Sequence, residues 1–369
     1  MNILHLSGVS NWGGGEYHIE NLCKELALTN PEVHTTVFCV KDGPFHHRLK
    51  ETEIDFVTAP LRLKIDLRYS LKLGQICKSK HIDLIHIHDT TALQLAIIAD
   101  KIYKLPPFIF SKKTSFEIKQ RKKTLYKYNY PKIKKILCVS KETQRVSEKA
   151  IVEHNKLVTV YHGTNLKTKS DQTPFKLRDK FAISDNTLII GNVANHIRAK
   201  DLDTLINVAD RLINHEKQSQ FIFVQIGTFT ERTAPLLERI ASLNLNKHIV
   251  FMGYTEKASN FIPQFDVSLM TSQSEGVPQF IYESMYHKVP VVSTDVGGIP
   301  EIIEHGVNGL LAPAHDFKAL SKSVLKLATN PNLRDKFVDA SYNKVTQNFT
   351  TSKMAQQTLE IYREILKTH

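Results

Sequence analysis

The chain has few of the residues that mark stapled, metal-bound or membrane-spanning proteins. Its 369 residues include one tryptophan and four scattered cysteines: Cys23, Cys39, Cys77 and Cys138. None of them has the CxxC spacing of a zinc or redox site. No apolar run approaches the roughly 20 residues that a membrane-spanning helix needs. These absences argue against a disulfide scaffold and an integral membrane protein, and they favour a cytoplasmic protein with reduced thiols.

Two common phosphate-binding signatures are also missing. The sequence contains neither the GxGxxG of a dinucleotide-binding turn nor the GxxxxGK[ST] of a P-loop. The opening MNILHLSG lacks the basic segment and the long apolar core of a signal peptide, so we interpret it as a first β-strand. With 41% apolar and 23% charged residues the composition is that of a globular protein, long enough for two domains with separate cores.

Acidic residues are outnumbered, and the imbalance is concentrated in one segment. The formal net charge is +12, and residues 101–135 contain twelve Lys and Arg against one acid, Glu117, which gives a local net charge of +11. Six aromatic residues are interleaved with this charge: Phe108, Phe110, Phe116, Tyr126, Tyr128 and Tyr130. Two functional hypotheses fit, an anionic membrane surface and nucleic acid. We favour the membrane, because no nucleic-acid motif accompanies the charge; a merely solvated basic face remains the alternative.

Short apolar runs alternate with amphipathic stretches along the chain, a pattern typical of parallel α/β sheets. We predict strands at Ile3–Leu6, Val33–Val40, Leu84–His88, Phe108–Phe110, Ile136–Val139, Leu188–Val193, Phe221–Ile226, His248–Phe251, Val267–Met270 and Val289–Ser293. Helices are expected at Glu16–Leu28, Leu202–Asn214, Ala234–Ser242, Gln279–His287 and Lys318–Ala328, with a last one near Thr351–Leu366.

The pattern restarts after a polar, turn-rich segment, Gly163–Pro174, which is the best candidate for a linker. We therefore expect an N-terminal domain over 1–165 and a C-terminal domain over 166–350. The terminal helix, within 351–369, has no strand after it and is expected to pack back on the first domain. The predicted fold class is α/β, with two Rossmann-like doubly wound domains facing across a cleft and ligand at the carboxyl ends of the strands.

The stretch 274–303 holds the most informative pattern, two carboxylates on either side of a turn. Glu275 falls in a loop, Gly276, Val277 and Pro278 form the turn, and Glu283 lies about one and a half turns into the next predicted helix. A helix N-terminus is a ready anion site. Two acceptors beside it suit the hydroxyls that flank a bound phosphate, which is the layout of a sugar-nucleotide site.

Two further junctions between strand and helix carry groups that suit phosphate. In the first half, Gly13, Gly14 and Gly15 allow close backbone approach, and the predicted helix from Glu16 points its positive end there. In the second half, the loop after Val193 carries Arg198 and Lys200, two cations that suit a diphosphate leaving group. A plain turn and a solvated basic loop are the alternatives for these two features.

The ordered set of motifs resembles the glycosyl transferases group 1 family, the retaining glycosyltransferases of GT-B fold with a Glu-x7-Glu signature. The resemblance covers almost the whole chain and rests on the GGGE turn, DLIHIHD (83–89), ILCVSKET (136–143), YHGTNL (161–166), the Lys200 loop, FMGY (251–254), the Glu pair and GGIPEIIEHGVNGLL (297–311).

The resemblance implies a role for each matching position. Glu275 would bind hydroxyls of the donor sugar, Glu283 the nucleotide ribose, and Lys200 with Arg198 the diphosphate. Gly14 and Gly15 would approach the phosphate, and Gly276, Val277 and Pro278 complete the donor-binding set. The family's reaction retains the anomeric configuration, with front-face attack and the leaving diphosphate helping to take the acceptor proton.

The sequence departs from the family pattern at three places. Asn195 stands where the family usually has an Arg, five residues before Lys200, and Asp201 replaces the usual Gly after that Lys. Lys112 and Lys113 occupy the place of a His that many members have, and some members that build surface glycans have an Arg pair there. We take Lys113 as a contact to sugar or phosphate and group it with Glu275 as catalytic.

Two patterns imitate metal sites. His86 and His88 alternate on one predicted strand with Asp89 after them, but a strand-end HxHD recurs in this fold without metal. Asp201 and Asp203 spell the DxD by which another glycosyltransferase fold holds manganese, but here they open a helix, where acids complement the helix dipole. We predict no metal ligands and a metal-independent reaction that uses no cofactor beyond the sugar nucleotide.

The sequence thus predicts a cytoplasmic glycosyltransferase on the inner face of the membrane, held there by residues 101–135. It would transfer a sugar from a nucleotide-diphosphate donor, with UDP favoured, to a lipid-linked or surface glycan. A sugar-nucleotide epimerase or phosphorylase on the same fold is one alternative. A catalytically inactive glycan- or nucleotide-binding relative is the other.

Overall fold

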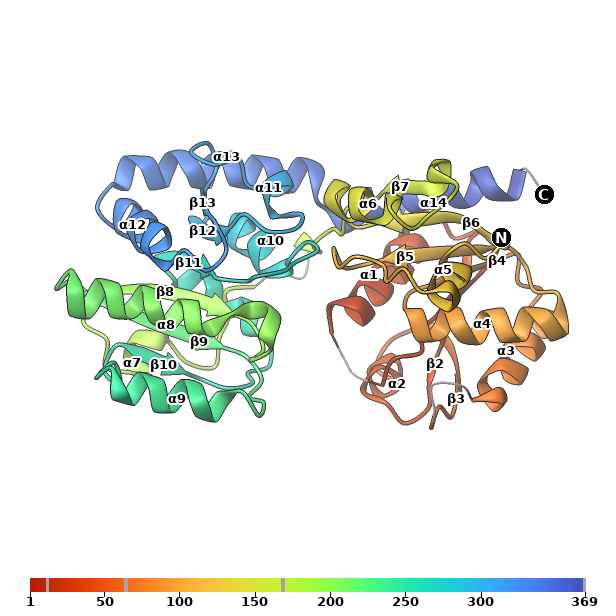
Figure 1. Cartoon of the computed structure of the whole chain (residues 1–369), viewed down its shortest axis with the longest axis horizontal. Helices are drawn as coiled ribbons and strands as arrows, with labels where there is room; N and C mark the ends of the chain where they lie inside the picture. The colour runs from red at the N-terminus through yellow and green to blue at the C-terminus, as the bar shows by residue number, and fades with distance from the viewer. Residues whose placement is uncertain (11–12, 63–65, 167–169, 368–369) are drawn as a thin grey trace. The chain divides into compact units, whose positions relative to one another are not determined.

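The computed structural model describes residues 1–10, 13–62, 66–166 and 170–367 and divides the chain into two compact units (Figure 1). Unit 1 comprises Met1–Gly163 together with Thr351–His369, and unit 2 comprises Thr164–Thr350. The chain therefore passes from unit 1 to unit 2 and back. Of the predicted linker, positions 167–169 lie outside the described residues, as do positions 11 and 12 of the segment before the glycine turn.

Unit 1 is built on a parallel sheet of seven strands in the order β3-β2-β1-β4-β5-β6-β7. Its strands are β1 (Asn2–Leu6), β2 (His34–Val40), β3 (Asp55–Ala59), β4 (Leu84–Ile87), β5 (Phe108–Lys112), β6 (Ile133–Cys138) and β7 (Leu157–Thr159). The five predicted strands of this half are confirmed within three residues at each end. The two edge strands, β3 and β7, were not predicted.

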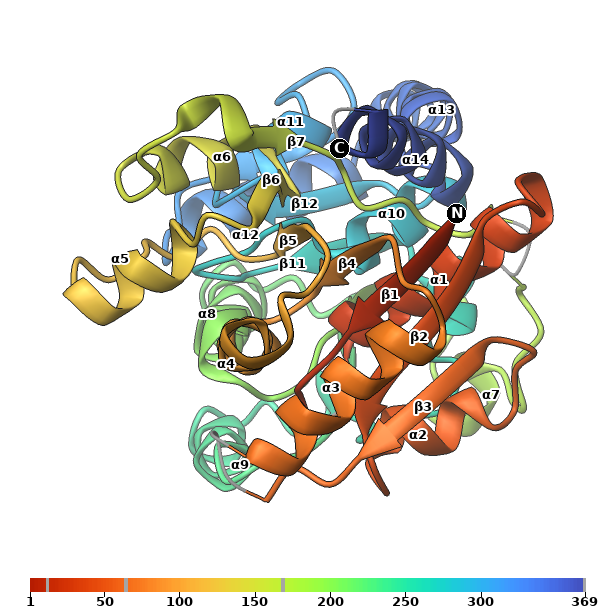
Figure 2. The same ribbon diagram turned by 90° about the vertical axis from the view of Figure 1, so that its right-hand side faces the viewer.

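Helices cover both faces of this sheet, because successive residues of each strand point to opposite faces. Leu4 and Leu6 face one cluster with α3 (Leu67–Ser79) and α4 (Thr90–Tyr103), whereas Ile3 faces another with α1 (Gly14–Thr29). Figure 2 shows α3 and α4 together on their side of the sheet. Unit 1 also contains the shorter helices α2 (Pro44–Leu49), α5 (Lys122–Tyr128) and α6 (Lys141–Glu148).

The helix α14 (Thr351–Lys367) belongs to unit 1 although the whole of unit 2 precedes it in the chain. It packs beside α1, and the Thr351 hydroxyl donates to Glu25 Oε1 over 2.6 Å. Leu359 is 3% exposed and shares a cluster with Ile3 and Leu84 of the central strands. This helix therefore supplies one wall of the unit 1 core.

Unit 2 repeats the design with a parallel sheet of six strands in the order β10-β9-β8-β11-β12-β13. Its strands are β8 (Leu188–Val193), β9 (Phe221–Ile226), β10 (Ile249–Phe251), β11 (Val267–Met270), β12 (Val291–Thr294) and β13 (Leu310–Ala312). The first four are confirmed within one residue at each end, and β12 begins two residues later than predicted. The edge strand β13 was not predicted.

Helices cover both faces of the second sheet as well. They are α7 (Leu177–Lys180), α8 (Leu202–Asp210), α9 (Thr233–Ser242), α10 (Gln279–Tyr286), α11 (Ile299–Ile302), α12 (Phe317–Ala328) and α13 (Pro331–Asn348). The predicted helix over Leu202–Asn214 is continuous in space, but its last part, Arg211–His215, is a π-helical turn. Among the described helices of both units, none has the length and hydropathy of a membrane span.

Both sheets have one topological switch point, where the strand order reverses. It lies between β1 and β4 in unit 1 and between β8 and β11 in unit 2, and both pairs are hydrogen-bonded neighbours. The loops that leave such a pair of parallel strands diverge to opposite faces and open a crevice at the carboxyl edge, where ligands bind in this class of fold. The predicted Rossmann-like, doubly wound organisation is confirmed.

The role of α14 can be tested by a core substitution on it. We expect Leu359→Ala to lower the free energy of unfolding of unit 1 by about 2–5 kcal/mol, because it leaves a cavity against the central strands. Hydrogen exchange of β1 and β4 amides under native conditions measures that free energy locally. The neighbouring exposed residue gives the control, since Glu360→Ala should change it by less than about 0.5 kcal/mol. Equal effects of the two variants would contradict the described packing.

Candidate functional site

At the switch point of unit 2, the loop after β8 is tied to the loop after β11. The Thr271 hydroxyl donates to the backbone carbonyls of Lys200 and Asp201, at 3.1 and 3.0 Å. The backbone N–H of Gln273 donates to the backbone carbonyl of Ala199 at 2.9 Å. These hydrogen bonds hold the loop after β8 beside the loop after β11, although about 70 residues separate them in sequence. The distance between the side chains of the two loops is thereby fixed.

The two loops meet in an ion pair between predicted site residues. Lys200 Nζ donates to Glu275 Oε1 over 2.6 Å, and the two side chains are 21% and 10% exposed. An ion pair so shielded from water is strengthened by its low-dielectric surroundings, and a charge left alone there is costly. Lys200 and Glu275 thus form a matched pair that can exchange partners with a ligand that offers both a phosphate and hydroxyl groups.

The Gly-Gly turn that follows β12 packs against the backbone of the loop that contains Glu275. Gly297 has φ +58°, and a Cβ at this position would lie 1.8 Å from the Glu275 carbonyl oxygen. The Gly298 N–H then donates to the Gly276 carbonyl at 2.9 Å. Both the left-handed backbone and the close approach require glycine at 297. The GGIPE motif is therefore part of the same site as the Glu pair.

Glu283 is positioned by the helix α10. Pro278 occupies the N-cap position, one residue before the first-turn position predicted for it, and Glu283 is the fifth helical residue, 9% exposed. The Ser284 hydroxyl contacts Ser268 Oγ at 2.8 Å, which anchors the helix to β11. The buried Val277 and Pro278 complete the turn between the two carboxylates.

The departures from the family pattern have local structural explanations. Asn195 is exposed, and its Oδ1 accepts the Thr228 N–H at 2.9 Å, so the side chain holds the loop after β9. Asp201 has φ +47°, a left-handed conformation that glycine adopts without strain. Arg198 is exposed on the 3₁₀ turn Arg198–Lys200, in the same loop as Lys200.

The DxD pattern has other partners in the structure. Asp201 occupies the N-cap of α8, but its carboxylate does not cap a backbone N–H as an N-cap aspartate usually does. Instead it bonds to the Thr204 hydroxyl and to His315 Nδ1, each at 2.7 Å. Asp203 pairs with Arg239 at 2.8 Å. The two carboxylates are thus engaged in separate contacts.

In unit 1 the helix α1 begins earlier than predicted. Gly13 is its N-cap, and Gly14 and Gly15 are its first two residues, so the glycines form the helix start rather than a turn before it. A Cβ on Gly14 would meet no atom within 4 Å, and one on Gly15 would lie 3.4 Å from Lys113 Nζ. Gly15 therefore leaves room for the Lys113 side chain.

The two lysines at the end of β5 have different roles, because the strand extends to Lys112 and alternation separates them. Lys112 is 5% exposed, and its Nζ donates to Thr114 and Phe116, which folds the loop after the strand. Lys113 lies on the other face, and its Nζ donates to the Gly15 carbonyl at 3.0 Å. Burial lowers the pKa of each ammonium to about 8.

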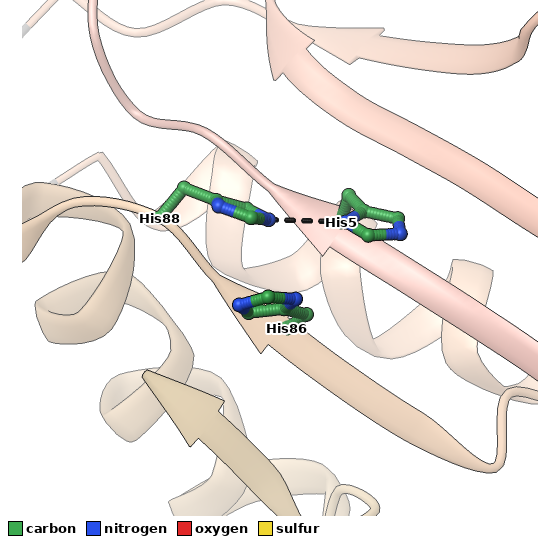
Figure 3. Close-up of side chains that lie close together, drawn as sticks. All are labelled: His5, His86 and His88. Carbon is green, nitrogen blue, oxygen red and sulfur yellow. Dashed lines mark hydrogen bonds between the residues drawn. The ribbon is translucent and has the colours of Figure 1, made fainter. Parts of the chain in front are cut away.

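Lys113 lies near a group of buried histidines, most of which sequence reasoning missed. His86 on β4 and His88, the first residue after that strand, are joined by His5 on β1, while His18 of α1 and His162 stack on each other with ring centroids 4.2 Å apart. Figure 3 shows the first three. Burial lowers the pKa of all five imidazoles, to about 3 for His5 and His162. The signal available in the sequence was the alternation of His5 with the core residues of its strand.

The basic segment 101–135 is spread over α4, β5, α5 and β6, and this corrects part of its interpretation. Four of its six aromatic residues are core residues: Phe108, Phe110, Tyr128 and Tyr130. Phe116 and Tyr126 are exposed, by 59% and 53%. We call "the basic surface" the exposed set Lys101, Lys104, Phe116, Lys119, Arg121, Lys122, Lys123 and Tyr126. Continuous sequence could not separate these residues from the strand residues between them.

Comparison with known proteins gives consistent matches over both halves. The family described as glycosyl transferases group 1 matches residues 175–344, and glycosyltransferase family 4 matches residues 12–168. The N-acetyl-alpha-D-glucosaminyl L-malate synthase of Bacillus anthracis is 19% identical over 96% of this chain and 95% of its own length. A UDP-Gal:alpha-D-GlcNAc-diphosphoundecaprenol alpha-1,3-galactosyltransferase of Escherichia coli is 19% identical over 92% of this chain and 91% of its own.

Similarity in structure extends over the whole chain. The Anabaena protein HepE, solved in complex with UDP, matches with a TM-score of 0.85 and 19% identity over 99% of this chain and all of its own. Its likeness supports a shared fold, and the two parallel α/β units described above are the two halves of a GT-B architecture. With the group 1 model on unit 2, the family 4 model on unit 1 and relatives that match over almost the whole length, the chain is a glycosyltransferase whose second unit belongs to the glycosyl transferases group 1 family.

Proposed function

We propose that this protein is a retaining glycosyltransferase that transfers a sugar from a UDP-sugar to a hydroxyl of a lipid-linked or surface glycan. The observation that carries the proposal is the shielded Lys200–Glu275 pair at the switch point of unit 2, where a cation and a hydroxyl acceptor stand 2.6 Å apart. In a nucleotide sugar the diphosphate is bonded directly to the sugar. A cation that binds the diphosphate and a carboxylate that binds the sugar hydroxyls must therefore lie close together, as Lys200 and Glu275 do. HepE, which shares the fold, has been solved with UDP and with UDP-glucose.

Unit 2 would bind the donor with the following division of labour. Lys200, with Arg198 in the same loop, would neutralise the diphosphate as it leaves. Glu275 would release its hold on Lys200 and accept hydrogen bonds from the sugar hydroxyls. Glu283, one and a half turns into α10, would accept the ribose hydroxyls, and the Gly276–Pro278 turn sets the spacing between the two carboxylates.

The chemistry would retain the configuration at the anomeric carbon. The acceptor hydroxyl attacks from the face that the leaving diphosphate vacates, the bond from the anomeric carbon to the diphosphate oxygen breaks, and the diphosphate takes the acceptor proton. Because Lys200 and Arg198 supply positive charge at the leaving group, we propose that the reaction needs no metal ion. Lys113 and the Gly14–Gly15 helix start of unit 1 would contact sugar or phosphate, and unit 1 would bind the acceptor.

The acceptor assignment is supported by relatives and by the basic surface. The galactosyltransferase of Escherichia coli named above acts on a diphosphoundecaprenol-linked sugar, as its name states. The basic surface combines six exposed cations with two exposed aromatic rings. Basic residues near an anionic membrane contribute about 1 kcal/mol each, and aromatic rings settle at the interface. We therefore propose a cytoplasmic enzyme, peripheral on the inner face of the membrane.

The donor class can be tested by thermal stability and by turnover. In a panel of UDP-, GDP- and ADP-sugars, the true donor should stabilise the protein by about 2.7 kcal/mol at a hundredfold excess over its dissociation constant. It should also release free UDP when a lipid-linked glycan acceptor is added, which separates transfer from epimerisation. Stabilisation by none of the compounds would contradict the proposal.

The role of Glu275 can be tested by an isosteric change. Glu275→Gln should lower kcat/KM by at least about a hundredfold, because a charged acceptor for the sugar hydroxyls and the partner of Lys200 are lost together. The exposed Glu238→Gln on α9 is the matched control and should leave the rate unchanged. A Glu275→Gln enzyme as fast as the wild type would remove this residue from the mechanism, whatever the donor proves to be.

Lys113 predicts a characteristic pH dependence. Its pKa is lowered to about 8, so the ammonium is present below that pH and is lost above it. If the charge contacts sugar or phosphate, kcat/KM should fall as the pH rises through about 8. Lys113→Arg, which stays charged, should move that fall to higher pH. Lys113→Met should be slow at every pH without a transition near 8; a profile identical to the wild type would exclude the contact.

Membrane association can be measured by sedimentation with lipid vesicles. The full chain should bind vesicles that contain phosphatidylserine and should not bind neutral phosphatidylcholine vesicles. Lys122→Gln with Lys123→Gln should weaken binding roughly thirtyfold, at about 1 kcal/mol for each cation removed. The matched control is the exposed pair of α12, Lys322→Gln with Lys326→Gln, which should bind like the wild type. Equal binding to neutral and anionic vesicles would refute this part of the proposal.

A further inference from the structure

Three histidines converge at the switch point of unit 1. His5 comes from β1, His86 from the neighbouring central strand β4, and His88 from the position directly after β4. Each offers one ring nitrogen, and these three atoms all lie within 4.8 Å of one another. The side chains are buried, with exposures of 0%, 0% and 4%. Figure 3 shows the three rings facing one another from the ends of the two strands.

The hydrogen bonds of this cluster are incomplete. A neutral imidazole has one donor and one acceptor nitrogen. His5 Nδ1 and His88 Nε2 lie 3.0 Å apart and share one hydrogen bond. The other nitrogens, His5 Nε2 and His88 Nδ1, are buried and have no partner among the described residues. These two unpartnered nitrogens are not the pair that lies 3.0 Å apart, so a ligand held between the two rings would bind His5 Nδ1 and His88 Nε2 in place of their shared hydrogen bond.

The imidazole ring of His86 is oriented by hydrogen bonds at both of its nitrogens. Its Nδ1 lies 2.5 Å from the Tyr362 hydroxyl of α14, and its Nε2 lies 2.7 Å from Ser111 Oγ of β5. Histidines that bind metals usually keep one nitrogen hydrogen-bonded to such a group while the other binds the ion. His86 could exchange one of these two bonds for a metal and retain the other.

We propose that His5, His86 and His88 form a binding site for one divalent transition-metal ion such as Zn²⁺. Three imidazoles are an established zinc ligand set, and ligands in a tetrahedral site lie little more than 3 Å apart, close to the present separation of His5 and His88. The absence of oxygen ligands among these three residues disfavours Mg²⁺ and Ca²⁺. A fourth position would be left for water.

The sequence analysis predicted no metal ligands at His86 and His88, and the third member of the cluster, His5, lies 81 residues before His86. The ion would join the carboxyl ends of β1 and β4 and so stabilise unit 1. It takes no part in the proposed transfer, whose charge neutralisation lies with Lys200 and Arg198 of unit 2. The inference therefore stands or falls independently of the proposed function.

The test is metal uptake by the purified full chain without an affinity tag. Because the imidazoles are buried, the protein is loaded both by incubation of the folded state and by refolding with the metal. We expect one Zn²⁺ per chain in equilibrium dialysis, a Co²⁺ form with the visible absorption of a tetrahedral site, and a higher melting temperature for the loaded protein. No stoichiometric uptake by either route would overturn the proposal.

Variants identify the ligands. His5→Asn and His88→Asn should each abolish the Co²⁺ absorption, and the exposed His154→Asn should retain it. Circular dichroism of the metal-free variants checks that they are folded. Unchanged Co²⁺ spectra in both cluster variants would place any bound metal elsewhere and would also overturn the assignment.

Discussion

The pairing of Lys200 with Glu275 depends on the polarity of the sheet. In a parallel sheet all strands end at the same edge, and at the switch point the chain leaves two adjacent strands in opposite directions. The loop after β8 and the loop after β11 therefore meet although 75 residues separate the two charged side chains. Thr271 and Gln273 fix the backbones, and Gly297 lets the chain pass against the Glu275 carbonyl. The ion pair between Lys200 and Glu275 thus lies between two loops that hydrogen bonds to backbone carbonyls hold together.

The same topology carries different polar groups in the two units. At the switch point of unit 2 a cation and an anion compensate each other within a shielded space. At the equivalent place in unit 1 the strand ends carry imidazoles, and the Lys113 ammonium, which interacts with them electrostatically, donates to the Gly15 carbonyl. Charge complementarity suits unit 2 to a ligand that is itself charged and polar. The neutral imidazole nitrogens at the corresponding position of unit 1 suit the transition-metal ion proposed above.

Sequence patterns predicted the interior of both sheets well and their margins poorly. β8, β9 and β11 match the predicted residues because most residues of a parallel strand buried on both faces are apolar. The edge strands β3, β7 and β13 are only three to five residues long, and β3 and β7 are partly exposed, so their apolar signal is weak. The start of α1 was missed by two residues because glycine is uncommon inside helices, although it is tolerated at the first positions.

The candidate site was predictable only where residues lie close in sequence. The spacing from Glu275 to Glu283 follows from one turn and one helix, so local rules suffice. The contacts of Lys200 with Glu275, and of His5 with His88, depend on strand order, which no local pattern contains. From the sequence, Asn195 and Asp201 are only the absence of the Arg and the Gly that the family usually has at these positions. In the structure they are a loop tether and a left-handed helix start.

The position of α14 has a consequence for synthesis of the protein. Ribosomes make the seven strands of unit 1 first, yet the helix that covers Ile3, Leu84 and their neighbours emerges only after the whole of unit 2. During translation that apolar face is open to water and to other nascent chains, which is the usual origin of aggregation. Unit 2, which is continuous in sequence, can complete its core earlier. The first unit to be translated is therefore the last to mature.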